Sequence, residues 1–424
     1  MKKILALLLA LVLVLGLVAC GETAAPAEPA EQAPAETAEQ APEAAAATLK
    51  VGVVLVGDEN EGYTYSHIAG VREAMENTGL TEADVIWKFS IPEDEKCYEA
   101  CVDCAKQGCN LIITNSYSHQ SYCQQAATEY PDVQFVAMTG DTAKASGLAN
   151  FHNAFTRIYE ARYVAGIVAG MKLNELIADG KVAEKNYKPD GTIRIGYVGA
   201  YPYAEVVSGY TAFFLGIKSV CKDVSMDVQY TNSWFDPVAE SEAATALMNS
   251  GCIIIGQHAD STGAPSTCEA ALNAGTVVYS VGYNVDMLEV APNAALTSPT
   301  NKWGVYYTEI FQAMLDGKTF DTNWAEGYEK DAVMITPLGA SCAEGTKEAV
   351  DQAIADIKAG KIKVFDTKTF TVGGQEVTSA FATDTDGDWT PDADEAIFDG
   401  CYNESYFQSA PSFSLRIDGI TELN

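Results

Sequence analysis

The sequence is poor in histidine and in positive charge. It contains four histidines and 26 lysine and arginine residues, against 58 aspartate and glutamate residues. The formal net charge of −32 argues against a nucleic-acid partner, because binding to phosphate backbones depends on basic side chains. The histidines share no spacing typical of zinc ligands, and no phosphate-binding glycine loop or Ser-His-Asp arrangement stands in a catalytic context. We therefore expect neither a resident metal nor a cofactor.

Long hydrophobic runs are confined to the first twenty residues. Two lysines are followed by the apolar run 4–19, which is short for a membrane span of about 20 residues. The run ends in Leu17-Val18-Ala19-Cys20-Gly21, which resembles the bacterial lipoprotein signal. We interpret residues 1–20 as a lipoprotein signal peptide with Cys20 as the lipidated residue. The alternative is an ordinary secretory signal in which the cysteine is accidental.

Residues 21–48 consist almost entirely of Ala, Pro, Glu, Gln and Thr and contain no lysine or arginine before Thr48. Such a composition cannot bury enough apolar surface to offset the entropy lost on ordering. We expect a disordered tether. The membrane would then be reached through the lipid anchor, with the folded part on the extracytoplasmic face of a bacterial cell membrane.

From residue 49 onward, short apolar runs typical of buried strands alternate with helical patterns. The expected strands are 49–56, 85–89, 111–114, 133–138, 193–198, 226–230, 253–255 and 276–281. The expected helices are 65–77, 93–107, 119–129, 157–176, 205–220, 238–249 and 266–274. Two runs of strand–helix–strand units predict an α/β protein with two parallel-sheet lobes. Polar ligands bind beyond the carboxyl ends of such strands, and the stretch 253–265 places Gln257, His258, Asp260 and Ser261 at one of those ends.

Several segments together resemble the basic membrane protein (BMP) family, the purine and nucleoside receptors of ABC importers. The segments are Lys50–Val54, Gly62–His67, Arg157–Gly166, Gly196–Val198, Thr231–Pro237, Gln257–Asp260, Val281–Met287 and Lys302–Gly304. The resemblance implies the type I periplasmic-binding-protein fold, with two Rossmann-like lobes joined by a hinge. The expected divisions are lobe 1 at 49–152 with about 296–330 returning to it, lobe 2 at 153–295 with about 331–360 returning, and a C-terminal extension at 361–424.

The resemblance also implies a purine base or nucleoside as ligand, an ABC permease as partner, and a monomer. The residues expected to bind the ligand are Tyr63, Asn115, Ser116, Tyr203, Trp234, Asp260 and Asp286. Aromatic faces would stack on the flat base, and carboxylates or amides would read its edge. Asn284 stands where nucleoside binders carry an acid, which favours a free base. Asp236 and Glu205 are also open to interpretation as acids of helix N-termini.

Two other functions remain open. A sugar receptor of the same architecture would use Tyr63, Tyr203 and Trp234 to stack on sugar faces. A purine-processing hydrolase would need a general acid or base in the cleft, a role for which Asp260 and His258 are candidates. Nothing in the sequence singles out either of them, so we do not expect an enzyme.

Three further features carry alternatives. Cys97, Cys101 and Cys104 share one face of an expected helix, and we interpret them as buried apolar side chains rather than as a metal or cluster site. Residues 371–377 have the Gly-Gly pattern of a hairpin. Within 384–395, acids or hydroxyls fall at calcium-loop spacing, but the position of the usual glycine holds a tryptophan, and we favour a solvated loop. The calcium candidates are Asp384, Asp386, Asp388 and Glu395.

Overall fold

The structure, a computed structural model, describes residues 48–382 and 393–424. The signal peptide with Cys20, the expected tether up to residue 47, and Asp384, Asp386 and Asp388 of the acidic loop lie outside the described residues. Glu395 is described, and its carboxylate accepts hydrogen bonds from the Ser379 hydroxyl and from the Ala380 and Ile397 amides.

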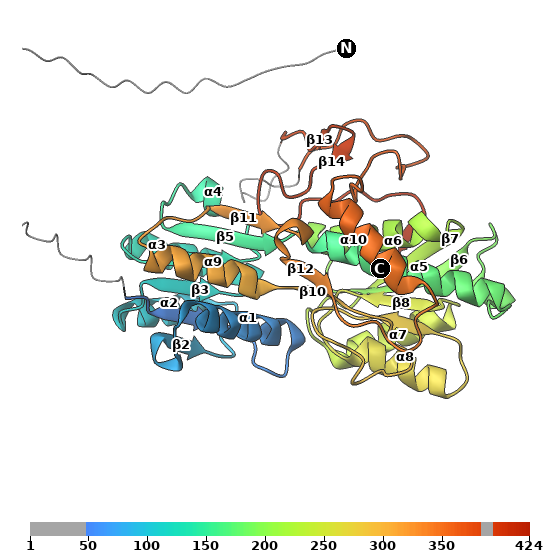
Figure 1. The fold of residues 1–424 in the computed structure, drawn as a ribbon, viewed down its shortest axis with the longest axis horizontal. Helices are drawn as coiled ribbons and strands as arrows, with labels where there is room; N and C mark the ends of the chain where they lie inside the picture. The colour runs from blue at the N-terminus through green and yellow to red at the C-terminus, as the bar shows by residue number, and fades with distance from the viewer. Residues whose placement is uncertain (1–47, 383–392) are drawn as a thin grey trace, which may run out of the picture. The chain divides into compact units, whose positions relative to one another are not determined.

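The first sheet has six parallel strands in the order β11-β5-β4-β3-β1-β2 (Figure 1). The strands are β1 (Val51–Val54), β2 (Val85–Lys88), β3 (Leu111–Thr114), β4 (Gln134–Met138), β5 (Phe151–Thr156) and β11 (Asn323–Glu326). Its helices are α1 (Gly62–Thr78), α2 (Glu95–Lys106), α3 (Gln120–Glu129), α4 (Ala143–Ser146) and α9 (Trp303–Leu315). Apolar side chains bury both faces of this sheet, as expected for parallel strands.

The second sheet has five parallel strands in the order β15-β7-β6-β8-β9. The strands are β6 (Ile193–Gly199), β7 (Val224–Tyr230), β8 (Ile254–Gln257), β9 (Tyr279–Val281) and β15 (Ile420–Glu422). Its helices are α5 (Ile158–Ala178), α6 (Ala204–Val220), α7 (Pro237–Asn249), α8 (Gly263–Asn273) and α10 (Thr346–Lys358). The glycines Gly166 and Gly216 let α5 and α6 approach closely, because a Cβ at either position would meet the backbone of the other helix. Short 3-10 turns occupy 82–84, 117–119, 184–186 and 328–330.

Within residues 48–382 and 393–424, the chain passes between the two sheets three times. The crossings run from β5 to α5, from β9 through β10 (Pro299–Asn301) to α9, and from β11 through β12 (Val333–Ile335) to α10. Strands β10 and β12 pair antiparallel, so the second and third crossing segments support each other. In Figure 1 this pair lies between the two sheets. Strand β5 belongs to the first sheet and runs to Thr156, a few residues past the expected end of lobe 1 at 152.

The C-terminal region, expected as an extension at 361–424, is in part built into the second sheet. At the expected hairpin, Gly373 and Gly374 adopt positive φ, and Val372 and Gln375 exchange backbone hydrogen bonds, although no strand extends from this turn. Strands β13 (Ile397–Phe398) and β14 (Cys401–Tyr402) form a small pair of their own. Strand β15 then joins the second sheet beside β7.

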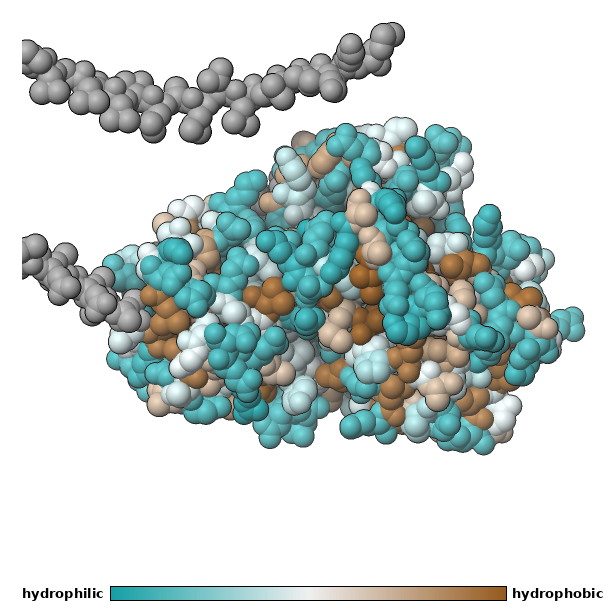
Figure 2. Space-filling view, viewed as in Figure 1, coloured by the Kyte–Doolittle hydropathy of each residue, from teal (hydrophilic) through white to brown (hydrophobic). Residues whose placement is uncertain are grey.

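Cys97, Cys101 and Cys104 are buried against the first sheet, which agrees with their interpretation as apolar core residues. A Cβ on Gly52 of β1 would clash with Cys104, which shows how closely this helix face approaches the strand. Among residues 48–382 and 393–424, none of the helices has the length and apolar character needed to cross a membrane. The face of the molecule in Figure 2 is dominated by hydrophilic residues, as the acidic composition leads one to expect.

Candidate ligand-binding site

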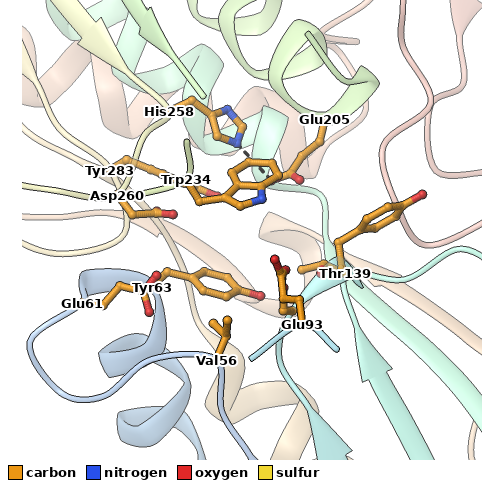
Figure 3. A pocket seen from close by; sticks show the side chains of 12 residues that line it. Val56, Glu61, Tyr63, Glu93, Thr139, Glu205, Trp234, His258, Asp260 and Tyr283 are labelled. Carbon is orange, nitrogen blue, oxygen red and sulfur yellow. Dashed lines mark hydrogen bonds and ion pairs between the residues drawn. The ribbon is translucent and has the colours of Figure 1, made fainter. Parts of the chain in front are cut away.

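A cavity lies at the carboxyl ends of the strands of both sheets (Figure 3). The space between its walls, including the part that is open to solvent, is about 540 Å³. The lining residues are Val56, Glu61, Tyr63, Glu93, Ser116, Tyr117, Thr139, Glu205, Trp234, His258, Asp260 and Tyr283. Each follows the end of one of the strands β1–β4 or β6–β9. The site is therefore assembled by the parallel topology itself.

Aromatic side chains from both sheets form the flat parts of the wall. Tyr63, in the first turn of α1, donates its hydroxyl to the backbone oxygen of Asn115 and packs edge-on against His67 with ring centroids 4.6 Å apart. Trp234 follows β7 and lies opposite Tyr63 across the cavity in Figure 3. Tyr283 follows β9 and closes the side next to His258, with ring centroids 5.0 Å apart. These contacts hold the rings of Tyr63 and Tyr283 in place at the cavity wall.

The polar part of the lining is acidic. Glu61 and Glu93 come from loops of the first sheet. Asp260 comes from a loop of the second sheet, and Glu205 from the first turn of α6. No lysine or arginine is among the described residues that line the cavity. Glu61 accepts a hydrogen bond from the Thr64 hydroxyl at 2.5 Å, and burial raises the pKa of the Glu61 carboxyl. In their ionised form these carboxylates accept hydrogen bonds and cannot donate them, so in that form they suit a ligand rich in donors.

Asp260 is the most deeply buried of these acids. Its backbone amide donates to the Trp234 oxygen at 2.8 Å, which couples the two loops that carry them. Its Oδ1 accepts from the Asn284 side-chain amide at 2.7 Å. Burial raises the pKa of Asp260 well above its ordinary value, and the carboxyls of Glu61, Glu240 and Glu205 raise it further. A ligand that donates a hydrogen bond to this carboxylate would relieve part of that electrostatic cost.

His258 and Glu205 form a pair at the edge of the cavity. His258 Nε2 is 3.0 Å from Glu205 Oε1, the contact drawn as a dashed line in Figure 3. Burial lowers the pKa of His258 to about 4, and the nearby positive charge of Arg162 contributes, so the ring is neutral near neutral pH. A neutral imidazole then donates from Nε2 to Glu205. The Arg162 guanidinium itself lies behind the wall, 3.8 Å above the ring of Tyr283.

The structure brings four of the seven sequence-predicted ligand residues to the cavity: Tyr63, Ser116, Trp234 and Asp260. The other three do not line it. Asn115 is buried beneath it, accepting a hydrogen bond from the Val56 amide and donating to Thr64. Tyr203 is 49% exposed and stacks on Tyr201 at the rim.

Asp286, the last of the three, lies in an exposed turn where its carboxylate caps the Leu288 amide. Asp236 is the N-cap of α7, accepting from the Val238 and Ala239 amides at 3.0 Å, as one of its two interpretations predicted. Glu205 stands in the first turn of α6 and also lines the cavity.

Sequence reasoning did not select Val56, Glu61, Glu93, Thr139 or Tyr283. All of them follow strand ends, which is the signal that was available for finding them. Tyr283 even stands inside one of the segments that carry the family resemblance. Glu61 and Glu93 did not stand out in the sequence, because the chain has 58 acidic residues and such residues mostly face solvent.

A family model described as ABC transporter substrate-binding protein, PnrA-like, matches residues 48–367. This chain belongs to that family, the Bmp family. Substrate-binding proteins of ABC importers are extracytoplasmic receptors that deliver a small-molecule ligand to a permease. The prediction of the family from the sequence is thereby confirmed.

Individual relatives of this Bmp-family chain differ in their named ligands. A purine-binding protein of Brucella abortus is 32% identical over 322 residues, which cover 76% of this chain and 84% of the relative. An ABC transporter protein of Haloferax volcanii, named for glucose binding, is 29% identical over 290 residues, which cover 68% of this chain and 66% of the relative.

The fold has solved counterparts. A solute-binding protein of an ABC transporter system from Aeropyrum pernix superposes with a TM-score of 0.61 at 16% identity, covering 75% of this chain and 93% of that chain. The architecture is the type I periplasmic-binding-protein fold, as predicted.

Proposed function

We propose that this Bmp-family receptor binds a purine base or nucleoside in the cavity between its two sheets and delivers it to an ABC permease, from a lipid anchor at Cys20. The observation that carries the proposal is the composition of the lining. Tyr63 and Trp234 offer flat apolar faces on opposite sides, and carboxylates surround the space between them. A planar, donor-bearing heterocycle complements both features.

The charge of the cavity narrows the ligand class. Four carboxylates with no lysine or arginine among the described lining residues repel an anionic ligand. A nucleotide would place its phosphate in this field, so nucleotides are disfavoured against the corresponding bases and nucleosides. The amino and ring N–H groups of adenine or guanine, by contrast, donate to carboxylates.

A sugar is the second candidate, and a specific observation favours it. Sugar hydroxyls also donate to carboxylates, sugar faces stack on aromatic rings, and the Haloferax volcanii relative is named for glucose. A purine and a sugar differ in shape. A purine ring is planar, so it can stack on Tyr63 with one face and on Trp234 with the other. The purine-binding relative is the more similar of the two and is covered over more of its length.

A thermal-shift screen of bases, nucleosides, sugars and nucleotides tests the proposal. A ligand that binds only the native state stabilises it by about 2.7 kcal/mol at one hundred times its dissociation constant. We expect purine bases or nucleosides to raise the melting temperature, and AMP and D-glucose to leave it unchanged. A shift produced by D-glucose and by no purine would favour the sugar receptor instead.

The proposed anchor has its own test. The lipidation pattern ends at Cys20, so Cys20→Ser removes the acceptor of the lipid and is expected to move the protein from the membrane fraction to the soluble fraction of the producing bacterium. Fractionation followed by immunoblotting measures the change, with Cys221→Ser, at a buried cysteine of the folded part, as the control. Retention of the Cys20→Ser protein at the membrane would contradict the anchor.

A further inference from the structure

A line of buried hydrogen bonds leads from the cavity to the segments that join the two sheets. The Asn284 side-chain amide donates to Asp260 Oδ1 at 2.7 Å. Asn284 Oδ1 in turn accepts from the Asn301 side-chain amide at 3.1 Å. Asn301 Oδ1 accepts from the Thr156 hydroxyl at 2.5 Å. The exposed fractions of Asp260, Asn284, Asn301 and Thr156 are 7%, 3%, 5% and 1%.

The order of donors and acceptors in this line is fixed. An asparagine side chain donates through its nitrogen and accepts through its oxygen, and each of the two asparagines uses one group in each direction. The line therefore starts at the Thr156 hydroxyl and ends at Asp260, whose carboxylate only accepts hydrogen bonds when it is ionised. The Asn284 amide uses Oδ1 of Asp260 and not Oδ2.

The far end of the line stands at the crossings. Thr156 is the last residue of β5, directly before the first crossing into α5, and Asn301 is the last residue of β10 in the second crossing. Asn284 follows β9 with a φ of +62°, a conformation that asparagine tolerates better than most residues. Its backbone is held by Pro299 and Thr300 of the second crossing, through its amide to the Pro299 oxygen and its oxygen to the Thr300 hydroxyl.

We propose that Asn284, Asn301 and Thr156 are positioning residues, which orient the Asp260 carboxylate for the ligand and connect it to the two crossing segments. The proposal rests on the proposed function only in placing the ligand at Asp260. Its consequence is that the Thr156 hydroxyl contributes to ligand affinity, although Thr156 does not line the cavity.

The physical reason is the cost of an unpaired buried polar atom. Removing the Thr156 hydroxyl leaves Asn301 Oδ1 without its donor in a buried site, and the Asn301 amide can then rotate away from Asn284. Asn284 then loses the hydrogen bond from the Asn301 amide, and its own amide is no longer held in the orientation that donates to Asp260. Burial already raises the pKa of Asp260 while the Asn284 hydrogen bond lowers it, so a looser Asn284 raises that pKa further. The groups that face Asp260 and raise its pKa with it are Glu61, Glu205 and Glu240.

The test compares Thr156→Val with Thr156→Ser in the full-length protein, using calorimetric titration with adenine. Valine removes the hydroxyl at nearly constant shape, and serine restores it. We expect Thr156→Val to weaken binding roughly threefold to tenfold, as expected for one buried hydrogen bond, and Thr156→Ser to bind within about twofold of the parent protein. Thr211→Val is the matched control, because the Thr211 hydroxyl is buried without a hydrogen-bond partner among the described residues.

A pH series separates positioning from general loosening of the fold. Binding by an ionised Asp260 strengthens as pH rises through the pKa of the free protein, so Thr156→Val is expected to shift the midpoint of that rise to higher pH. Thr211→Val is expected to leave the midpoint unchanged. Equal affinities and equal midpoints for Thr156→Val and Thr211→Val would overturn the proposal.

A stability measurement without ligand distinguishes failure of the proposed function from failure of the proposed positioning role. In urea unfolding of the ligand-free protein, Thr156→Val and Asp260→Asn are expected to be non-additive, because they alter two ends of one hydrogen-bond line. Additive effects contradict the line whatever the ligand is. If adenine fails to bind the parent protein while the coupling is present, the proposed function fails and the positioning line stands.

Discussion

Replacing Asp260 with asparagine is expected to weaken purine binding by roughly 10-fold to 100-fold while raising the melting temperature of the ligand-free protein. Hydrogen bonds to charged groups contribute about 1.5–3 kcal/mol, which corresponds to that loss of affinity. The gain in stability has a separate cause. Glu61, Glu205 and Glu240 crowd a carboxyl that is 7% exposed, and a neutral amide removes their repulsion. Loss of function with gain of stability is a pattern typical of binding sites.

The pH dependence of this variant follows from the raised pKa of Asp260. A carboxyl whose pKa is higher in the folded than in the unfolded state lowers stability as pH rises from its unfolded value of about 3.9 through its folded value. The parent protein without ligand is therefore expected to lose stability over that window relative to Asp260→Asn. Purine binding is expected to release a proton over the same window, which appears as a buffer-dependent heat in calorimetry and is absent in the variant.

Asp286→Asn is the matched control. Asp286 lies 26 residues further along, in an exposed turn, and was the other acid that the sequence nominated. We expect its affinity for purines to equal that of the parent protein. A loss in Asp286→Asn as large as in Asp260→Asn would show that the cavity described above is not where the ligand binds.

Removing either flat wall of the cavity is expected to weaken purine binding about 5-fold to 150-fold. Each aromatic face contributes about 1–3 kcal/mol when it stacks on a base. Tyr63→Ala and Trp234→Ala remove faces contributed by different sheets, so the double variant is expected to lose nearly the sum of the two free energies. Tyr63→Phe keeps the ring and loses only the hydrogen bond to the Asn115 oxygen, and a smaller loss is expected.

Neighbouring aromatic residues supply the controls for this pair. Tyr65 lies two residues after Tyr63 on the same helix, is 49% exposed and does not line the cavity, while Phe235 follows Trp234 and is also exposed. Calorimetric titration of Tyr65→Ala and Phe235→Ala is expected to give parent-like affinities. If Tyr63→Ala and Trp234→Ala also bind as the parent protein does, the base lies elsewhere and the aromatic walls are structural.

The sequence predicted the strands and helices that local patterns determine. It did not predict those that depend on tertiary contacts. Strands β1, β3 and β8 are built on short apolar runs, and the burial of those runs follows from composition alone. Strand β5 was not identified because its run is broken by His152 and Asn153. Both are buried, and the structure satisfies them through contacts that no local pattern encodes, such as the hydrogen bonds of Asn153 to Ala137 and Ala143.

The site was predictable in its position and only partly in its residues. Strand ends indicated where ligand contacts gather, which is why Tyr63, Trp234 and Asp260 were selected, and family resemblance added weight to them. Asp260 and Asp286 stand in similar motifs, and only burial separates them. Tyr203 is exposed, and the Asn115 side chain forms hydrogen bonds inside the protein. Both outcomes depend on the direction of the side chain, which strand–loop patterns do not determine.

The most direct measurement is calorimetric titration of the purified protein, after unfolding and refolding to remove any co-purified ligand, with adenine, adenosine, D-glucose and AMP. If the site holds a purine between Tyr63 and Trp234 among four carboxylates, adenine or adenosine is expected to bind saturably. AMP is expected to bind much more weakly, and D-glucose to give no heat of binding. Tight binding of D-glucose with no heat from either purine would contradict the account.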